Sequence, residues 1–283
     1  MNRVFAHIGL AVVGLLAACT NAAGASFYAA TASGTLSRFD TAAPSSPPIS
    51  TVAITGLGLG ELLIGIDIRP ADRKLYGITR DGSNAGRLYS VDVATGAATL
   101  VAALNADPAD LTAPYTSLAG STRFGMAFNP VSDRIRLVVA DDGRNFRINP
   151  TTGLVIGDTD LNPGTPHVVA VGYANSFAGA TTTTLYDIDS LQDMLFLQNP
   201  PNNGSLTPIG SLGVDMVDLV GFDVTAVGAT NAAYATASVA GNINLYSIDL
   251  GTGAATLVGV LNGNFQAIGI AVLSDHLFAD DFE

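Results

Sequence analysis

Short apolar segments bounded by Gly, Pro, Asn and Asp recur along the chain and predict β-strands. The clearest unit holds four of them in succession: Gly65–Ile68, Leu75–Ile78, Leu88–Asp92 and Ala98–Val101. The same series recurs at Gly221–Val224, Ala233–Ala235, Leu245–Asp249 and Ala255–Val258, with a Thr-Gly turn before each final segment. After the N-terminal segment no long window has helical periodicity. The pattern therefore predicts an all-β chain built from four-stranded units.

A glycine in the first strand of each unit marks the repeat. It stands at Gly65, Gly125, Gly172, Gly221 and Gly269, at intervals of 60, 47, 49 and 48 residues. Units of roughly 40–50 residues with several short strands are typical of propeller blades, because one sheet cannot bury both its faces alone. The sequence predicts a β-propeller of five four-stranded blades.

The two ends of the chain fit this plan. The segment Phe27–Ala30 aligns with the second strand of a blade, and Ile268–Val272 aligns with a first strand. Pairing of the N- and C-terminal segments would complete one blade and remove two exposed sheet edges. We expect one propeller domain over residues 26–273. Six blades are the alternative, which would need an extra sheet in the loop-like stretch at residues 105–121.

The N-terminus has the pattern of an export signal. Arg3 precedes an apolar run from Val4 to Ala18, which is too short to cross a membrane. Residues 1–18 are predicted to be a lipoprotein-type signal peptide, because residues 16–19 resemble a lipobox that ends at Cys19. Acylation of Cys19 would be the membrane attachment, and the following Thr20, in place of an Asp, favours the outer membrane by resemblance to the bacterial sorting rule. The alternative is ordinary cleavage after residues 23–25, which would discard Cys19 and give a secreted protein.

Composition limits the possible partners and chemistry. The net charge is −12, and Lys74 is the single lysine. Nucleic acid and anionic lipid surfaces are therefore unexpected partners, since they require clustered basic residues. Cys19 is also the single cysteine, so the mature domain has neither a disulfide nor a thiol nucleophile. His167 and His276 are the histidines outside the signal region, too few for a histidine-rich zinc site. Residues 274–283 are predicted to form a short acidic tail.

Two sets of oxygen-bearing residues are candidate calcium ligands. Asp158, Asp160 and Asn162 alternate along a turn, as calcium-binding loops require, although the distal acid of a helical calcium loop is missing. Asp67 and Asp223 occupy the same place on equivalent first strands, which line the channel of a propeller. They could hold a cation or act as acid and base. The alternative for both sets is structural, as turn residues and as caps of neighbouring backbone groups.

A repeated Asp or Asn points instead to structure. It follows the third strand of four units and precedes a turn, at Asp40, Asp92, Asn149 and Asp249. A catalytic residue breaks the symmetry of a repeat, whereas a side chain that caps a turn recurs in every blade. No Gly-x-Ser-x-Gly elbow occurs in the chain, so hydrolase chemistry of that type is not predicted and no residue is assigned a catalytic role.

Several longer motifs of the sequence resemble those of one bacterial family. They are Gly65–Pro70, Phe128–Pro130 with Asp133–Arg136, Asn145–Pro150, Leu161–Gly164 and Gln198–Asn202. Together they are similar to the domain of unknown function 4394 family. The resemblance spans nearly the whole chain after the signal region and implies an exported repeat protein. It brings no established catalytic or binding residues.

The leading functional hypothesis is a non-enzymatic propeller of the cell envelope that binds a protein, peptide or glycan. Its loops at residues 105–122 and 157–166 depart most from the repeat, and loops on a rigid scaffold are frequent recognition sites. The rival hypothesis is a calcium-dependent propeller hydrolase or lactonase that uses Asp67, Asp223, Asp158 and Asp160. A passive envelope component is a third possibility.

Overall fold

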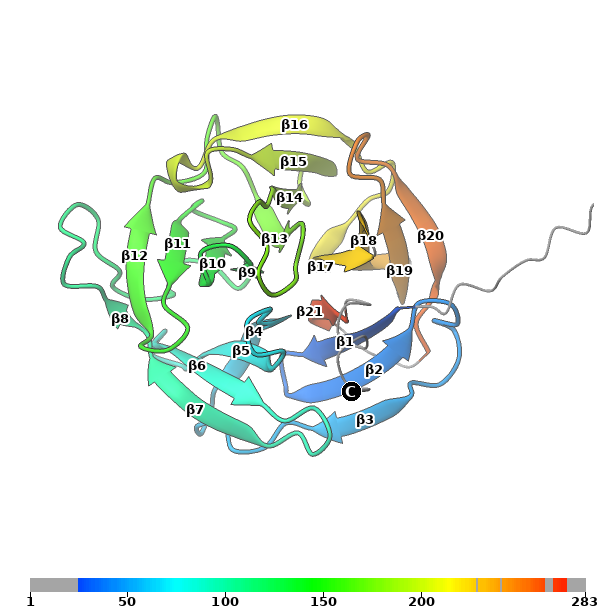
Figure 1. Cartoon of the computed structure of the whole chain (residues 1–283), viewed down its shortest axis with the longest axis horizontal. Coiled ribbons are helices and arrows are strands. Elements are labelled where there is room, and N and C mark those ends of the chain that lie inside the picture. Colours follow the sequence, from blue (N-terminus) through cyan, green and yellow to red (C-terminus); the bar gives the residue numbers. More distant parts are fainter. Residues whose placement is uncertain (1–24, 228, 240, 263–266, 274–283) are drawn as a thin grey trace, which may run out of the picture.

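The computed structural model describes residues 25–227, 229–239, 241–262 and 267–273, which form five sheets around a central axis (Figure 1). The prediction of an all-β propeller with five blades is confirmed. The predicted signal peptide with Cys19, the predicted tail at residues 274–283 and His276 lie outside the described residues. No helix in the described part of the chain is long and apolar enough to cross a membrane.

Each blade is an antiparallel sheet whose strands follow one another from the axis to the rim. Blade 1 comprises β21 (Ala267–Val272), β1 (Ser26–Thr31), β2 (Thr35–Asp40) and β3 (Ser50–Ala53). Blade 2 comprises β4 (Leu62–Ile68), β5 (Leu75–Arg80), β6 (Gly86–Val91) and β7 (Ala98–Ala103). Blade 3 comprises β9 (Phe124–Asn129), β10 (Arg134–Val139), β11 (Asn145–Ile148) and β12 (Leu154–Asp158), with β8 (Asn105–Ala106) added at its rim. Blade 4 comprises β13 (Val168–Tyr173), β14 (Leu185–Asp189), β15 (Met194–Gln198) and β16 (Leu206–Ser211). Blade 5 comprises β17 (Val217–Val227), β18 (Thr230–Val239), β19 (Asn242–Ile248) and β20 (Ala255–Val260).

The two ends of the chain close the ring, as predicted. The C-terminal strand β21 is the innermost strand of blade 1 and pairs with β1, where Phe27 lies opposite Val272 and Ala29 opposite Ile270. The innermost strands β21, β4, β9, β13 and β17 then contact one another in that order around the axis. Closure leaves no innermost strand with an open neighbour, which protects the inner sheet edges.

The stretch that a sixth blade would need is a packed loop with one short strand. Within residues 105–121 the two residues of β8 pair in parallel with β12, and the remainder forms turns and bends. Tyr115 and Leu118 are buried in the core between blades 2 and 3. The chain therefore has five blades, and this loop fills space beside them.

The repeated turn residues behave as the sequence indicates. The side-chain oxygens of Asp92, Asn149 and Asp249 each accept hydrogen bonds from the backbone N–H groups two and three residues ahead, and Asp40 accepts one from the residue two ahead. The glycine of the turn at Gly96 has φ +76°, and a Cβ there would lie 2.1 Å from the Ala53 carbonyl oxygen of the neighbouring blade. These turns therefore shape the blades and link them.

Candidate functional site

The axis of the propeller is closed at the level of the repeated glycines. A Cβ added at Gly221 would lie 2.9 Å from the Ile270 nitrogen, and one at Gly269 would lie 3.1 Å from the Ile66 nitrogen. Side chains are thus excluded because the innermost strands approach each other closely. The hollow that remains on the axis is about 10 Å³, roughly the space of one water molecule.

Asp67 and Asp223 lie on innermost strands, as predicted, and are almost fully buried. Asp67 accepts hydrogen bonds from the backbone N–H of Ile68 and, across to the next blade, from that of Phe128, both at 2.6 Å. Asp223 does the same with Val224 at 2.7 Å and with Val272 in blade 1 at 2.6 Å. Each carboxylate therefore joins its own innermost strand to the next one around the ring.

The two carboxyl groups also interact electrostatically. Burial raises the pKa of Asp67, and the charge of Asp223 raises it further. Burial raises the pKa of Asp223 to about 6, against the lowering effect of its two backbone hydrogen bonds. The structure thus brings the predicted pair together and gives both oxygens of each residue a backbone partner. Whether the pair also holds a cation stays a prediction.

The second predicted calcium set is spread over different partners. Both oxygens of Asp158 face guanidinium groups, with Arg136 Nη1 at 2.8 Å and Arg147 Nε at 2.7 Å and Nη2 at 2.8 Å. The Asn162 amide donates to the backbone carbonyls of Asp160 and Asn203. The Asp160 side chain is exposed. Over the described ranges no three His, Cys, Asp or Glu side chains are grouped to hold a metal.

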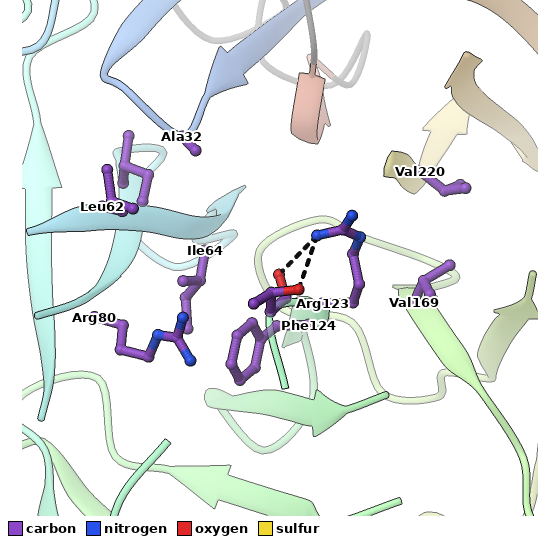
Figure 2. A pocket seen from close by; sticks show the side chains of 10 residues that line it. Ala32, Leu62, Ile64, Arg80, Arg123, Phe124, Val169 and Val220 are labelled. Atoms are coloured by element: carbon purple, nitrogen blue, oxygen red, sulfur yellow. Dashed lines mark hydrogen bonds between the residues drawn. The ribbon is translucent and has the colours of Figure 1, made fainter. Parts of the chain in front are cut away.

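A hollow of about 180 Å³ lies at one end of the channel, where the innermost strands begin (Figure 2). We call it the mouth pocket. It is lined by Ala32, Leu62, Leu63, Ile64, Arg80, Thr122, Arg123, Phe124, Val169 and Val220. The Arg80 guanidinium carbon lies 5.6 Å from the Phe124 ring centroid, and Arg123 donates to its neighbour Thr122. Apolar side chains therefore surround two cationic groups at this mouth.

The long loop at residues 105–122 leads into the mouth pocket and is held from two blades. Arg80 of blade 2 donates to the Leu118 and Ser121 carbonyls. Arg144 of blade 3 donates to the carbonyls of Ser117 and Ala119. The loop is thus a fixed part of the surface, and its deletion would open the core that Leu118 fills.

A larger cavity of about 440 Å³ lies between blades 3 and 4, at the opposite ends of the innermost strands. We call it the seam pocket. Its lining comprises Asn129, Ser132, Arg134, Ile135, Arg136, Arg147, Tyr173, Pro200, Pro201, Asn202 and Asn203. The sequence analysis missed this site. The signal that could have revealed it is the alternation Arg134-Ile135-Arg136 along a strand, which places two arginines on one face.

The loop at residues 157–166 supports the seam pocket from behind. Asp158 holds the Arg136 and Arg147 guanidinium groups, and Thr159 donates its backbone N–H to the carbonyl of Asn202. Asn202 belongs to the 3₁₀ helix η1 (Pro201–Asn203) of blade 4. The loop proposed as a recognition element thus positions residues of both blades around the cavity.

His167 is partly buried and forms polar contacts through both of its ring nitrogens. One ring nitrogen lies 3.1 Å from Ser190 Oγ and the other 3.0 Å from Asp141 Oδ1. The set contains the residue types of a hydrolase triad, but Ser190 is 8% exposed while the Asp141 side chain is 48% exposed. A nucleophile must be reachable and its orienting acid sheltered, so this arrangement fits a link that joins the segment before β13 to two turns.

Similarity to solved structures extends to the fold alone. The chain is similar to a putative 6-phosphogluconolactonase from Bacteroides uniformis, with 13% identity, a TM-score of 0.45, and coverage of 85% of this chain and 83% of that one. It is also similar to the major Malassezia sympodialis allergen Mala s 1, with 12% identity, a TM-score of 0.44, and coverage of 89% and 76%. Such distant likenesses carry no argument about activity. No curated protein matches the chain significantly.

A family model matches most of the sequence. The family is described as "Domain of unknown function (DUF4394)", and the match spans residues 35–271, from β2 to β21. It therefore covers blades 2 to 5 in full and, in blade 1, β2, β3 and most of β21, but not β1. The chain belongs to the DUF4394 family, as its sequence motifs indicate.

Proposed function

We propose that this chain is a non-enzymatic binding protein of the cell envelope that holds a protein or peptide partner at the mouth pocket. The observation that supports the proposal is apolar surface left open beside a hollow. Leu62 lines the mouth pocket with 51% of its surface exposed, and Leu59 on the same connection is fully exposed. Export by residues 1–18 and an anchor at Cys19 are part of the proposal.

The size of the mouth pocket favours a macromolecular partner. Its volume of about 180 Å³ is below the roughly 300 Å³ at which small-molecule pockets begin. Such a hollow suits one inserted side chain of a larger partner, whose remaining surface would cover the apolar rim. Arginine side chains, here Arg80, are enriched at the centres of protein interfaces.

The lactonase or hydrolase alternative is not favoured, because the carboxylates it would use have other partners. Asp67 and Asp223 accept backbone N–H groups of two innermost strands each. Asp158 is paired with two arginines. The hollow on the axis has room for one water molecule and none for a substrate.

A pair of matched substitutions tests the mouth pocket. Leu62→Glu places a charge at the mouth, and Leu257→Glu places one on the rim strand β20, where Leu257 is 55% exposed against 51% for Leu62. The purified domain of each variant would be cross-linked to envelopes, and its partners quantified by mass spectrometry. We expect Leu257→Glu to keep the partners of the wild type and Leu62→Glu to lose them. Retention of every partner by Leu62→Glu would refute the mouth as the binding surface.

The anchor has its own test. Cells that express the full chain would be supplied with labelled palmitate, and the wild type would be compared with Cys19→Ala. We expect the wild type to carry the label and to sediment with membranes, because the acyl chains partition into lipid. We expect Cys19→Ala to carry none. An unlabelled wild type would show that ordinary cleavage removes Cys19.

A further inference from the structure

We propose that the seam pocket is a second binding site, which takes a carboxylate-bearing sugar residue such as a hexuronate. It does not depend on the mouth pocket, since the two lie at opposite ends of the innermost strands. The seam pocket is bordered by the last residues of β9 and β13, whereas the mouth pocket is bordered by the first residues of β4 and β9. The two proposals can therefore fail separately.

Positive charge is concentrated in this cavity. Arg134 and Arg136 lie on the same face of β10, and Arg147 of β11 lies directly opposite Arg136. Like charges at facing positions of a sheet destabilise it. The chain has 24 acidic and 12 basic residues, yet the described lining of the pocket includes three arginines and no acid. An arrangement that costs stability in an acidic protein is expected where function requires it.

Arg136 also breaks the symmetry of the repeat. It lies opposite Ala127 of the innermost strand, a place that aligns with Tyr76 opposite Asp67 and with Tyr234 opposite Asp223. In blade 1 the same place is held by Tyr28. Three blades thus keep a tyrosine where blade 3 has an arginine. A residue that departs from the repeat serves a purpose that the other blades lack.

The acids around the arginines neutralise part of their charge. Asp158 pairs with Arg136 and Arg147. Asp187 of β14 is buried near Arg136, and its pKa is raised by burial and lowered by that guanidinium. Asp133 precedes Arg134 but forms its ion pair with Arg69. Within the described chain the Arg134 guanidinium group, which lies at the pocket, therefore has no salt-bridge partner.

Arg136 is a positioning residue that holds the wall of the pocket. It is 2% exposed, and its Nη atoms donate to Asn145 at 2.7 Å, Asp158 at 2.8 Å and Asn202 at 2.8 Å. Its Nε, both oxygens of Asp187 and Oε1 of Gln198 are buried without a protein partner among the described residues. Buried polar atoms are paired in nearly all native structures, through the protein, a ligand or ordered water. This seam therefore has hydrogen-bonding capacity that the fold itself does not use.

Two guanidinium edges are available to a ligand. Arg134 donates one hydrogen bond, to the Asp133 carbonyl, and has no ion pair within the described chain. Arg147 uses Nε and Nη2 on Asp158, which leaves Nη1. Guanidinium groups bind carboxylates through paired N–H donors, with more geometric specificity than an ammonium group provides. The anionic end of the ligand is therefore expected between Arg134 and Arg147.

The remaining lining favours a sugar over a peptide. Asn129, Ser132 and Asn202 place amide and hydroxyl groups around the cavity. Peptides are commonly bound as an added strand at a sheet edge or through apolar pockets, but β8 already pairs with the rim strand of blade 3. The volume of about 440 Å³ falls within the roughly 300–1,000 Å³ of small-molecule sites. A polyhydroxylated acid matches the donors and the size.

Calorimetric titration of the mature domain with D-glucuronate tests the proposal. Arg134→Gln removes the unpaired charge, and the exposed Lys74→Gln makes the same charge change outside the pocket lining. We expect the wild type and Lys74→Gln to bind equally, and Arg134→Gln to bind at least about tenfold more weakly. Ser132→Asp, a change at an exposed position, is expected to weaken binding by repulsion and provides a second variant. Melting curves would show that each variant is folded.

Five results would overturn the assignment. Equal binding of D-glucose would show that the carboxylate is not recognised. Binding of acetate or phosphate as tight as that of glucuronate would indicate a bare anion site, and tighter binding of a short acidic peptide would indicate a peptide site. No heat of binding by the wild type at millimolar glucuronate, or equal loss in Arg134→Gln and Lys74→Gln, would remove the seam pocket as a specific site.

Discussion

The axis of the propeller and the seam between blades 3 and 4 both bury charged side chains, yet they use them differently. On the axis, every oxygen of Asp67 and Asp223 accepts a backbone N–H, and the hollow between the strands is closed. At the seam, Arg136 and Asp187 keep buried polar atoms that have no protein partner among the described residues, and Arg136 lines a cavity of about 440 Å³. A buried charge is structural where the fold uses its hydrogen bonds and is a candidate for function where it does not.

The largest effect should come from the wall of the seam pocket. Arg136→Met removes three hydrogen bonds and one side of a buried ion pair. We expect a loss of about 3–5 kcal/mol in the free energy of unfolding, measured by urea denaturation. Arg134→Gln on the same strand should stay within about 0.5 kcal/mol of the wild type, because within the described chain the Arg134 side chain donates one hydrogen bond, to the Asp133 carbonyl. Equal stability losses in the two variants would show that Arg136 is no more important to the fold than Arg134.

Closure of the axis can be broken by one methyl group. Gly221→Ala would place a Cβ 2.9 Å from the Ile270 nitrogen and 3.0 Å from the Gly269 carbonyl carbon, and backbone cannot move aside cheaply. Overpacking of this kind should cost about 1–3 kcal/mol or more in urea unfolding. Gly82→Ala is the matched control, since a Cβ there meets no atom within 4 Å. If the two variants are equally stable, the axis is looser than the strand contacts indicate.

The axial carboxylates should give stability a pH dependence. Burial raises the pKa of Asp223 to about 6, so the folded state holds its proton more tightly than the unfolded state, where the pKa is about 3.9. The contribution of Asp223 is therefore fully present below pH 4 and is lost as the pH rises through 6, by at most about 1.4 kcal/mol per pH unit.

Asp223→Asn should flatten this slope. It should also cost about 1–3 kcal/mol at pH 4, because the amide NH₂ would face the N–H of Val224 or Val272. Urea titrations between pH 4 and 7 measure both effects. An unchanged slope in Asp223→Asn would assign the pH dependence to other groups.

The smallest expected effect is that of a chelator. Asp158 is held by two arginines, and the axial pair is held by backbone N–H groups. Melting curves of the purified domain with and without EDTA should therefore coincide. A stoichiometric calcium whose removal lowers the Tm would instead make Asp67 and Asp223 a metal site and would revive the hydrolase hypothesis.

The sequence predicted the features that recur. Motifs repeated at fixed offsets predict three features of the structure. These are the closure by β21 and β1, the capped turns at Asp92 and Asp249, and the innermost positions of Asp67 and Asp223. Features that recur can be predicted because each blade must bury its faces against its neighbours in the same way. Such reasoning is well suited to finding what all blades share.

The seam pocket could not be predicted in the same way. It depends on the register that puts Arg147 opposite Arg136 and on the approach of Asn202 from the next blade, a separation of 66 residues from Arg136. Spacing along the sequence does not reveal the two arginine partners of Asp158 either, and the alternating oxygens of its turn predict calcium ligands instead. Besides the alternation of arginines along β10, a second signal is the arginine at a place where three other blades have tyrosine, which is recognised only once the blades are aligned by their pairing.

One calorimetric experiment tests whether the seam pocket binds an acidic sugar while the axial carboxylates serve the structure alone. D-glucuronate would be titrated at one pH into the wild type, Asp223→Asn and Arg134→Gln, each shown to be folded. We expect Asp223→Asn to bind as the wild type does and Arg134→Gln to bind at least about tenfold more weakly. Loss of binding in Asp223→Asn with full binding in Arg134→Gln would contradict this expectation and place the ligand at the axis.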